Sequence, residues 1–461
     1  MAIHTSGSRA SALRLALARQ NNVECAEHQS RATEGVLSNT ALGPDLSVVT
    51  YVWPYICRQN AAPTSLYLAP PMRHRTIIRD PRDRVRNGHP WIFDNQVVRV
   101  EGDPKPGDVV QVFDDRRRPI GQGYFNPASK IQVRILTADL DEPIDDAFFF
   151  RKVKEAWAFR QRMVDTTSCR LIFGESDGLP ACVADKFGDT IVLQTLSLGM
   201  DRWKHSLVEA LREMTGVTRF YERNDVPIRE KEGLQPIKGF LSDAFTTRFP
   251  IVENGLKVQV DVAEGQKTGH FLDQRVNHAA IAPVVAGAHV LDCFTHTGGF
   301  ALHAAHYGAA RVEGLDISPS AIQAAAANAE LNGSADRCSF REANVFDFLT
   351  EAGRTGRKWD VVVLDPPAFA KSRATVAGAT RGYKEINLRA MKCLPRGGFL
   401  VTCSCSQHMA PDLFRAMIAD AAKDARRQLR EVYYGTQPPD HPVHWSIPES
   451  LYLKCLILQV L

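Results

Sequence analysis

The sequence contains little that would place it in a membrane, in an oxidising compartment or on a strongly charged partner. No apolar run approaches the roughly 20 residues that a membrane helix needs, so we expect no membrane span. The ten cysteines are scattered without paired spacing, which excludes a disulfide scaffold and indicates a reducing compartment, the cytoplasm. The net charge is only +4, which permits binding to nucleic acid but does not indicate it.

Two motifs are also incomplete. Cys403 and Cys405 lack the two-residue spacer and the companion pair of a zinc site, so we predict no metal. The turn Thr-His-Thr-Gly-Gly at 295–299 lacks the third spaced glycine of a dinucleotide fingerprint. This absence disfavours a dehydrogenase.

A series of short apolar strands, each ending in a polar residue, dominates the second half of the chain. Strands are predicted at 289–292, at 311–316, into 343–347 and at 361–364, with an alanine-rich helix at 321–331. Strands that alternate with helices predict an α/β fold with a doubly wound sheet. The polar residues are then expected at one edge of that sheet.

These strand ends predict a ligand with a ribose. Glycine in the turn after the first strand lets the backbone approach a ligand, and the helix that follows offers unpaired N–H groups. Asp316 ends the second strand, about 20 residues downstream, where Rossmann-like units hold ribose hydroxyls. A ligand with a ribose and an amino acid fits this turn better than a pyrophosphate.

In their order and spacing, the glycine turn, Asp316 and the strand end Asp365-Pro366-Pro367 resemble those of class I S-adenosylmethionine-dependent methyltransferases. The resemblance implies a Rossmann-like catalytic sheet and S-adenosylmethionine as the cofactor. The residues at the strand ends that we predict to bind the cofactor are Asp292, Phe294, Thr295, Thr297, Gly298, Gly299, Asp316, Ile317, Asn344 and Asp365.

Two segments precede these strands. Residues 1–71 show little periodicity, and we expect a poorly ordered N-terminal extension. Residues 72–145 are locally basic with short β-type runs, and they resemble a PUA domain, an RNA-binding β-barrel, in Gly-His-Pro-Trp-Ile-Phe at 88–93 and Gly-Asp-Val-Val-x-Val at 107–112. Arginines interleaved with aromatic residues suit phosphates and unpaired bases, while a solvated face of a small barrel is the alternative.

Residues 146–257 alternate between strand and helix, with helices predicted at 148–164 and 201–214. This part resembles the small α/β domain between the PUA and catalytic parts of one bacterial rRNA methyltransferase family. Its charged residues either line an RNA channel or pair with each other.

The stretch Gly-Gln-Lys-Thr-Gly-x-Phe-Leu-Asp-Gln-Arg at 265–275 matches that family as well. In the family this stretch packs over the methionine end of the cofactor. The match implies further cofactor contacts by Gln266, Lys267, Thr268, Gly269 and Arg275.

From residue 72 to 461 the chain resembles the bacterial family of 23S rRNA cytosine-C5 methyltransferases, with a catalytic domain at 258–461. The family's Ser-Cys-Ser after an apolar strand falls at 404–406, which implies that Cys405 attacks the base. Asp365 is then expected to bond cytosine N3, while Pro366, Pro367 and Phe369 contact the base. The expected partner is large-subunit rRNA, and a homodimer is also possible.

Two other functions stay open. A methyltransferase acting on a guanine nitrogen uses Asp-Pro-Pro-x-Phe without a thiol, and an RNA-binding module retains the fold without chemistry. A related cytosine-methylating family carries a second cysteine after the proline pair, where this chain has Ala368. The base that removes the C5 proton is therefore not identified by the motif.

Overall fold

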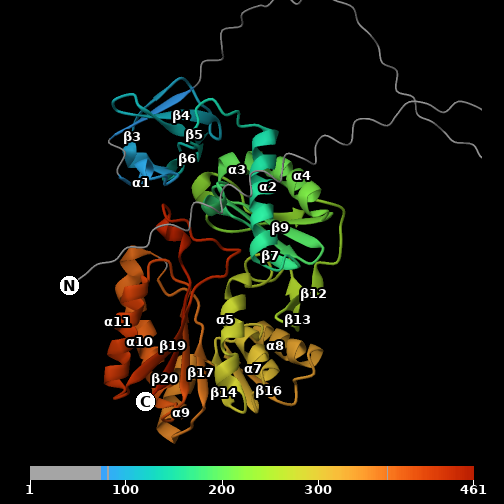
Figure 1. Ribbon diagram of the computed structural model, residues 1–461, viewed down its shortest axis with the longest axis vertical. Coiled ribbons are helices and arrows are strands. Elements are labelled where there is room, and N and C mark those ends of the chain that lie inside the picture. Colours follow the sequence, from blue (N-terminus) through green and yellow to red (C-terminus); the bar gives the residue numbers. More distant parts are fainter. Residues whose placement is uncertain (1–73, 80–82, 371) are drawn as a thin grey trace, which may run out of the picture. The chain divides into compact units, whose positions relative to one another are not determined.

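The computed structural model of the protein describes residues 74–79, 83–370 and 372–461 (Figure 1). The extension predicted at 1–71 lies outside these residues. Within them, no helix is both long enough and apolar enough to cross a membrane. The eight cysteines in this part of the chain are all free.

The first sheet has six strands in the order β2-β6-β5-β4-β1-β3 and curls on itself, as the blue ribbon in Figure 1 shows. Alternate residues such as Val110 and Val112 on β4 are buried, so the strands turn one face to a common core. A side chain at Gly123 would meet the carbonyl oxygen of Arg134 at 1.9 Å, so glycine is required where β5 crosses β6. The predicted small β domain is confirmed. Its elements are β1 (Arg75–Ile78), α1 (Asp83–Arg86), β2 (Trp91–Phe93), β3 (Val97–Glu101), β4 (Val109–Asp114), β5 (Pro119–Phe125) and β6 (Ile131–Thr137).

The second sheet has five strands in the order β11-β10-β9-β8-β7 and is followed by the hairpin β12–β13. The helix predicted at 201–214 is in fact two helices that break at Trp203. The ring of Trp203 stacks on Phe149 at 4.5 Å, and this tertiary contact overrides the helical pattern. The elements are α2 (Asp146–Met163), β7 (Ser168–Phe173), β8 (Cys182–Phe187), β9 (Thr190–Thr195), α3 (Leu198–Arg202), α4 (Lys204–Thr215), β10 (Arg219–Asn224), β11 (Ile237–Phe240), β12 (Arg248–Glu253) and β13 (Leu256–Asp261).

The third sheet has seven strands in the order β16-β15-β14-β17-β18-β20-β19. The five strands from β16 to β18 run parallel, and β20 is antiparallel to both of its neighbours. Its strands are β14 (His289–Cys293), β15 (Arg311–Asp316), β16 (Cys338–Glu342), β17 (Val361–Leu364), β18 (Phe399–Ser404), β19 (Leu429–Gly435) and β20 (Lys454–Val460). Its helices are α5 (Arg275–Ala280), α6 (Ala282–Val285), α7 (Gly299–His306), α8 (Pro319–Leu331), α9 (Val345–Thr355), α10 (Val376–Lys392) and α11 (Pro411–Asp424).

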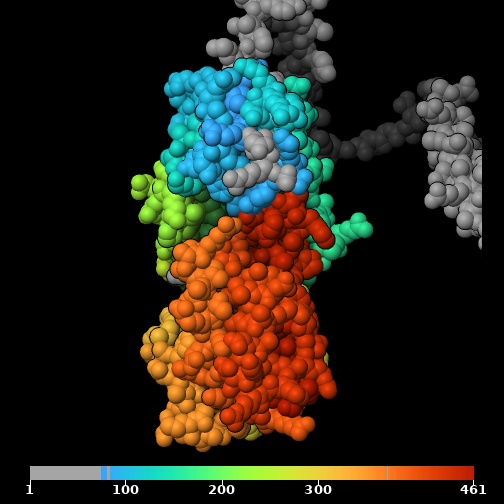
Figure 2. Space-filling view, turned by 90° about the vertical axis from the view of Figure 1, so that its left-hand side faces the viewer, coloured from blue at the N-terminus to red at the C-terminus, as the bar shows by residue number. Residues whose placement is uncertain are grey.

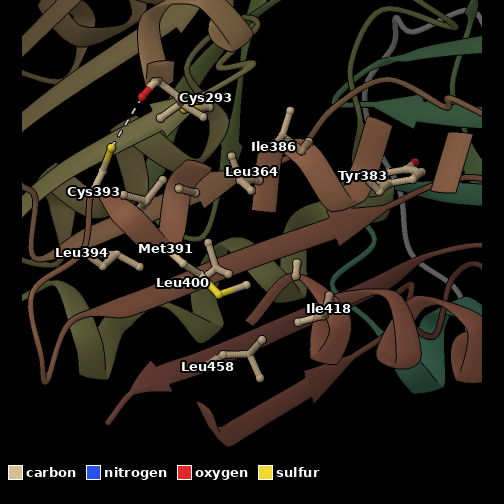
Figure 3. Close-up of a cluster of buried hydrophobic side chains, with 14 of the residues drawn as sticks. Cys293, Leu364, Tyr383, Ile386, Met391, Cys393, Leu394, Leu400, Ile418 and Leu458 are labelled. Atoms are coloured by element: carbon tan, nitrogen blue, oxygen red, sulfur yellow. Dashed lines mark hydrogen bonds between the residues drawn. The ribbon is translucent and has the colours of Figure 1, made fainter. Parts of the chain in front are cut away.

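Helices cover both faces of this sheet, because successive strand residues point to opposite sides. Leu364 and Leu400 pack in one core cluster with residues of α9, α10 and α11. Figure 3 shows this core with Ile386 and Met391 of α10 and Ile418 of α11. Val363 and Val401, one residue away on the same strands, pack with α6 and α7 on the other face. In Figure 2 the orange and red atoms of the C-terminal part form one continuous surface. The predicted doubly wound sheet is confirmed.

The strand predicted into 343–347 is wrong. The strand β16 ends at Glu342, and α9 begins at Val345. Asn344 is the N-cap, and its side-chain oxygen accepts hydrogen bonds from the N–H groups of Phe346 and Asp347 at 2.9 and 3.4 Å. The cap satisfies N–H groups that the first helical turn leaves free, so the apolar residues after it form a helix.

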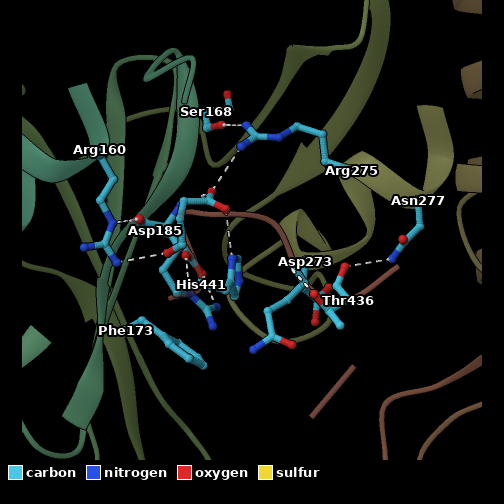
Figure 4. A network of polar contacts seen from close by, with 12 residues as sticks. Arg160, Ser168, Phe173, Asp185, Asp273, Arg275, Asn277, Thr436 and His441 are labelled. Carbon is cyan, nitrogen blue, oxygen red and sulfur yellow. Dashed lines mark hydrogen bonds and ion pairs between the residues drawn. The ribbon is translucent and has the colours of Figure 1, made fainter. Parts of the chain in front are cut away.

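A buried polar network joins the second sheet to the third (Figure 4). The guanidinium of Arg160, on α2, donates to Asp177 at 2.5 and 2.8 Å and to the backbone oxygen of Asp440 at 2.9 Å. The Asp440 carboxylate accepts from the Arg170 N–H at 3.0 Å and from the Arg275 guanidinium at 3.3 Å. Arg160 and Asp177 therefore pair with each other inside the protein, whereas an RNA channel along this part of the chain stays a prediction.

Replacing Asp440 with alanine is expected to lower the free energy of unfolding by about 3 kcal/mol, because the partly buried Arg275 charge and the Arg170 N–H lose their acceptor. Urea unfolding measures this change. The matched control is Asp420→Ala, which removes an exposed partner of Lys384 and should cost less than about 1 kcal/mol. Equal losses for the two variants would contradict the role assigned to the network.

Candidate cofactor pocket and active site

A cavity of about 360 Å³ lies where β14 and β17 end side by side. From β14 the chain continues to β15 and β16 on one side, whereas β17 and β18 lie on the other. This is the topological switch point of the sheet, the usual place of ligands in open α/β folds.

Most of the predicted site residues line this cavity. They come from the segment ahead of α5 and from the ends of β14, β15, β17 and β18. The lining includes Gln266, Lys267, Asp292, Phe294, Thr295, Thr297, Gly299, Asp316, Ile317, Asp365, Pro366, Pro367 and Cys405.

Three predicted cofactor residues have other partners in the structure. Thr268 is buried, and its hydroxyl donates a hydrogen bond to the Asp185 carboxylate at 2.6 Å. Arg275 donates to the Ser168 carbonyl at 2.7 Å as well as to Asp440. The Asn344 side chain caps α9. The polar atoms concerned bond within the protein and lie outside the cavity lining, and the cofactor contacts of these three residues stay predictions.

Three further predicted residues lie beside the cavity but outside its lining. Gly298 has φ +93° and Gly269 has φ +132°, so both have backbone conformations that other residues rarely adopt. The ring of Phe369 packs on Tyr383 at 4.7 Å. Phe369 therefore shapes the loop after β17, and its contact with a base stays a prediction.

Sequence reasoning missed several lining residues: His270, Phe271, Asp273, Gln274, His278, His296, Phe300, Ser318 and Leu453. Asp273 and Gln274 lie inside the 265–275 motif and were within reach of the sequence. His278, on α5, and Leu453, ahead of β20, carry no local signal, because only the fold brings them to the switch point.

The backbone around the cavity is unusual in the turn after β14 and in the segment ahead of α5. Among the described residues, seven that are not glycine have positive φ, and three of them, Lys267, Phe294 and His296, line this cavity. Such conformations cost energy and concentrate at ligand sites. A side chain at Gly299 would meet Nε2 of His278 at 2.8 Å, so only glycine fits there.

Asp316 is held in place at the end of β15. One carboxylate oxygen accepts from the backbone N–H of His296 at 3.0 Å, and the other accepts from the N–H of Ser318 at 2.9 Å. Both oxygens keep further lone pairs, and the residue lines the cavity. A carboxylate fixed in this way suits a pair of ribose hydroxyls.

Asp292 lies deeper. Its Oδ2 accepts from the Thr295 hydroxyl at 2.6 Å and from the Ala301 N–H at 3.0 Å. Its Oδ1 is buried without a partner. Burial raises the pKa of Asp292 to about 7, and the charge of Asp365 adds to the effect. An unpaired buried acceptor beside a cavity fits a ligand that brings a donor or a positive charge.

A second carboxylate braces the other side of the cavity. Asp273 accepts from Lys267 at 3.0 Å and from the Tyr452 hydroxyl at 2.7 Å. Burial alone would raise the pKa of Asp273, but the neighbouring Lys267 and His441 and the Tyr452 hydrogen bond hold it well below its usual value.

Glu253, His278 and His303 form the group among the described residues that could hold a metal, with ligand atoms within 4.8 Å of one another. Hydrogen bonds already occupy these atoms. Glu253 faces Nδ1 of His278 at 2.8 Å and Nε2 of His270 at 2.9 Å. The two ring nitrogens of His303 face the Gly299 carbonyl at 2.7 Å and the Asn254 amide nitrogen at 3.1 Å. The group braces the glycine turn, and the absence of a metal stays a prediction.

Cys405 follows β18 and lines the cavity from a tightly held turn. The Ser406 hydroxyl accepts from the Ala370 N–H at 3.2 Å and shares a hydrogen bond with the Tyr383 hydroxyl at 3.1 Å. The Ser404 hydroxyl donates to Tyr383 at 3.0 Å. These bonds fix the two neighbours of Cys405 and join them to the loop after β17.

The electrostatics of Cys405 and Asp365 are coupled. Burial raises the pKa of the Cys405 thiol to about 11, and the nearby Asp365 charge contributes. Burial also raises the pKa of Asp365 to about 6. At neutral pH the structure thus favours a thiol beside a carboxyl group that readily takes a proton.

A doubly wound sheet with a reversed strand, a glycine turn and an acid at the end of its second strand defines a class I S-adenosylmethionine-dependent methyltransferase. Family models match residues 77–138 as a PUA-like domain and residues 235–457 as an S-adenosylmethionine-dependent methyltransferase. A relative from Shewanella denitrificans, named ribosomal RNA large subunit methyltransferase I, is 43% identical over 397 residues, which cover 84% of this chain and 100% of the relative. The chain belongs to this family.

Other comparisons agree. A relative of the same name from Alteromonas mediterranea is 39% identical over 394 residues, covering 84% of this chain and 99% of the relative. The solved structure of a putative methyltransferase from Streptococcus mutans matches with a TM-score of 0.72 at 20% identity, over 84% of this chain and 100% of that one. This likeness shows the fold.

S-adenosylmethionine is the cofactor, as predicted. The residues present fit it. Asp316 offers two oriented oxygens for the ribose, and the unpaired Oδ1 of Asp292 suits the ligand's positive end. Gly299 leaves room for close approach of a ligand to the backbone, and the cavity volume of about 360 Å³ lies within the range of small-molecule pockets.

Asp316→Asn is expected to weaken cofactor binding about tenfold, because the amide offers one acceptor where the carboxylate offers two. The loss should be equal for S-adenosylmethionine and S-adenosylhomocysteine, since both contain the ribose. Isothermal titration calorimetry measures both affinities, with the exposed Asp347→Asn on α9 as the matched control. A loss confined to S-adenosylmethionine would contradict a ribose contact.

Asp292 predicts a pH dependence of stability. The folded protein keeps the Asp292 proton up to a pKa of about 7, whereas the usual value is 3.8. Between these pH values the folded state binds more protons, so stability falls as the pH rises. In cofactor-free protein, the free energy of unfolding of Asp292→Asn should therefore rise relative to that of wild type between pH 4 and pH 8, by on the order of 4 kcal/mol. Unfolding curves that stay parallel across this range would refute the shift.

Proposed function

We propose that this protein transfers a methyl group from S-adenosylmethionine to carbon 5 of a cytosine in large-subunit ribosomal RNA, with Cys405 as the nucleophile. The family supports the RNA substrate, since its relatives are named large-subunit rRNA methyltransferases. The observation that carries the reaction is that Cys405 and Asp365 line the same cavity as Asp292 and Asp316.

The target atom explains the need for a thiol. The cofactor supplies a methyl group on a positively charged sulfur, which is an electrophile. Carbon 5 of cytosine is a poor nucleophile in the free base. A Cys405 thiolate that adds to carbon 6 converts the ring into an enamine-like species whose carbon 5 is nucleophilic. Carbon 5 then takes the methyl group as the bond between that group and the cofactor sulfur breaks, and loss of the C5 proton and then of the thiolate restores the aromatic ring.

Asp365 is the acid in this scheme. Attack at carbon 6 pushes electrons towards N3, which then needs a proton or a strong hydrogen bond. A pKa of about 6 leaves Asp365 able to hold or release a proton near neutral pH. Pro366 and Pro367 follow directly and also line the cavity, where they limit the positions that the base can take.

A methyltransferase for a guanine nitrogen is the second candidate. It is favoured by the raised pKa of the Cys405 thiol, about 11, which keeps the sulfur protonated in the absence of RNA. Such an enzyme would use Asp365 to hydrogen-bond the base and would need no thiol. Dependence on Cys405 separates the two reactions.

Replacing Cys405 with alanine is expected to abolish methylation of unmodified large-subunit rRNA, by about a thousandfold or more, because the nucleophile is lost. Labelled cofactor and nucleoside mass spectrometry measure the product, which should be 5-methylcytidine. Cys403→Ala, two residues away and buried on β18, is the matched control and should keep most of the activity.

Two results would decide against the thiolate mechanism. One is label in a methylguanosine that survives Cys405→Ala, and the other is 5-methylcytidine formed at the wild-type rate by that variant. RNA containing 5-fluorocytidine gives a second readout, because fluorine at carbon 5 cannot leave as the proton does. It should therefore trap a covalent complex of RNA with wild type but not with Cys405→Ala.

A further inference from the structure

Lys454 is a fully buried lysine next to the turn that carries Cys405. It begins β20 and lies opposite Ser404 of β18, and its side chain is only 1% exposed. Its Nζ donates to the backbone oxygens of Ser406 and Tyr452, both at 2.8 Å. The side chain therefore ends at the backbone that immediately follows Cys405.

This ammonium makes no ion pair with a carboxylate anywhere in the described part of the chain. Two carbonyl oxygens satisfy two of its three N–H donors but do not neutralise its charge. Burial lowers the pKa of Lys454 to about 8, while a negative charge on Cys405 would raise it again. A buried charge without a partner is costly, so its retention calls for an anion at some stage of the reaction.

We propose that Lys454 is a positioning residue for Cys405, whose buried positive charge favours the thiolate and whose hydrogen bond fixes the turn. The inference rests on the proposed function, in which Cys405 is the nucleophile. Ionisation breaks the S–H bond, releases one proton to water and leaves one negative charge on sulfur. That charge then lies near the Lys454 ammonium, and the sulfur forms no new bond until it attacks the base.

The other groups around Cys405 do not supply this charge. Asp365 and Asp273 oppose the thiolate, because their carboxylates are negative. Lys267 favours it but is half-exposed and paired with Asp273 at 3.0 Å. The hydroxyls of Tyr383, on α10, and Tyr452, ahead of β20, complete the surroundings and carry no positive charge.

Alkylation of Cys405 by iodoacetamide tests the proposal, because only the thiolate reacts. Full-length protein without RNA is treated across a range of pH, and the Cys405 peptide is quantified by mass spectrometry. In Lys454→Gln, which keeps a donor but no charge, the alkylation rate at pH 7, where the Lys454 ammonium carries its charge, should fall about tenfold. It should stay at the wild-type value in Lys454→Arg and in the control Lys384→Gln, which removes an exposed, paired lysine.

An unchanged alkylation rate at pH 7 in folded Lys454→Gln would overturn the proposal. So would an equal fall in Lys454→Arg, since a purely structural role is lost in both variants whereas the charge is lost in one. The readout involves neither RNA nor methyl transfer. A wrong target base would therefore alter the nucleoside assay and leave the alkylation profiles unchanged.

A second measurement needs no change at Lys454. In Asp365→Asn protein, the rates of Cys405 alkylation by anionic iodoacetate and by neutral iodoacetamide are compared. A nearby positive charge attracts the anionic reagent, so the ratio of the two rates should exceed that of the neutral thiol N-acetylcysteine amide. A ratio at or below that of the free thiol would overturn the proposal even if Lys454→Gln fails to fold.

Discussion

The site depends on four carboxyl groups that line one cavity at the switch point of the sheet, two of which, Asp273 and Asp292, are buried. Asp273, Asp292, Asp316 and Asp365 all line one cavity of about 360 Å³, and among them Lys267 neutralises Asp273. Burial and mutual repulsion raise the pKa of Asp292 and of Asp365. S-adenosylmethionine carries a positive sulfur and an ammonium group, and these charges suit a cavity lined by several carboxyl groups.

The cofactor-lining segment ahead of α5 is held from both sides. Gln266 and Lys267 face the cavity, while the next residue, Thr268, bonds Asp185 on β8. Arg275, at the end of the same segment, bonds the Ser168 carbonyl on β7 and the Asp440 carboxylate. The second sheet thus does more than separate the PUA-like domain from the catalytic sheet, because it fixes one wall of the cofactor cavity. The motif at 265–275 combines residues that line the cavity with residues that tie the segment to its neighbours, and the sequence alone does not separate the two groups.

Much of the fold could be predicted because the periodicity of apolar residues and the residue types at strand ends are local properties of the sequence. The apolar runs that end at Asp292, Asp316 and Asp365 predicted the doubly wound sheet and ten of the 22 residues that line the cavity. Errors arose where tertiary contacts decide. Trp203 breaks a helix by stacking on Phe149, and Asn344 caps α9 where the pattern predicted a strand. His278 and Lys454 reach the site from elements with no motif of their own, so only the folded structure reveals them.

In the proposed reaction, Asp365 and Cys405 together carry no more than one negative charge. A thiolate beside an ionised Asp365 would place two negative charges in one half-buried cavity, and each raises the pKa of its neighbour. With Asp365 protonated, attack of the Cys405 thiolate on carbon 6 moves the negative charge towards N3, where the Asp365 proton is taken up. The sulfur becomes neutral as the carboxylate becomes negative. The cavity then holds a single negative charge on this pair before and after the attack, near the buried ammonium of Lys454, so neither step separates charge over a long distance.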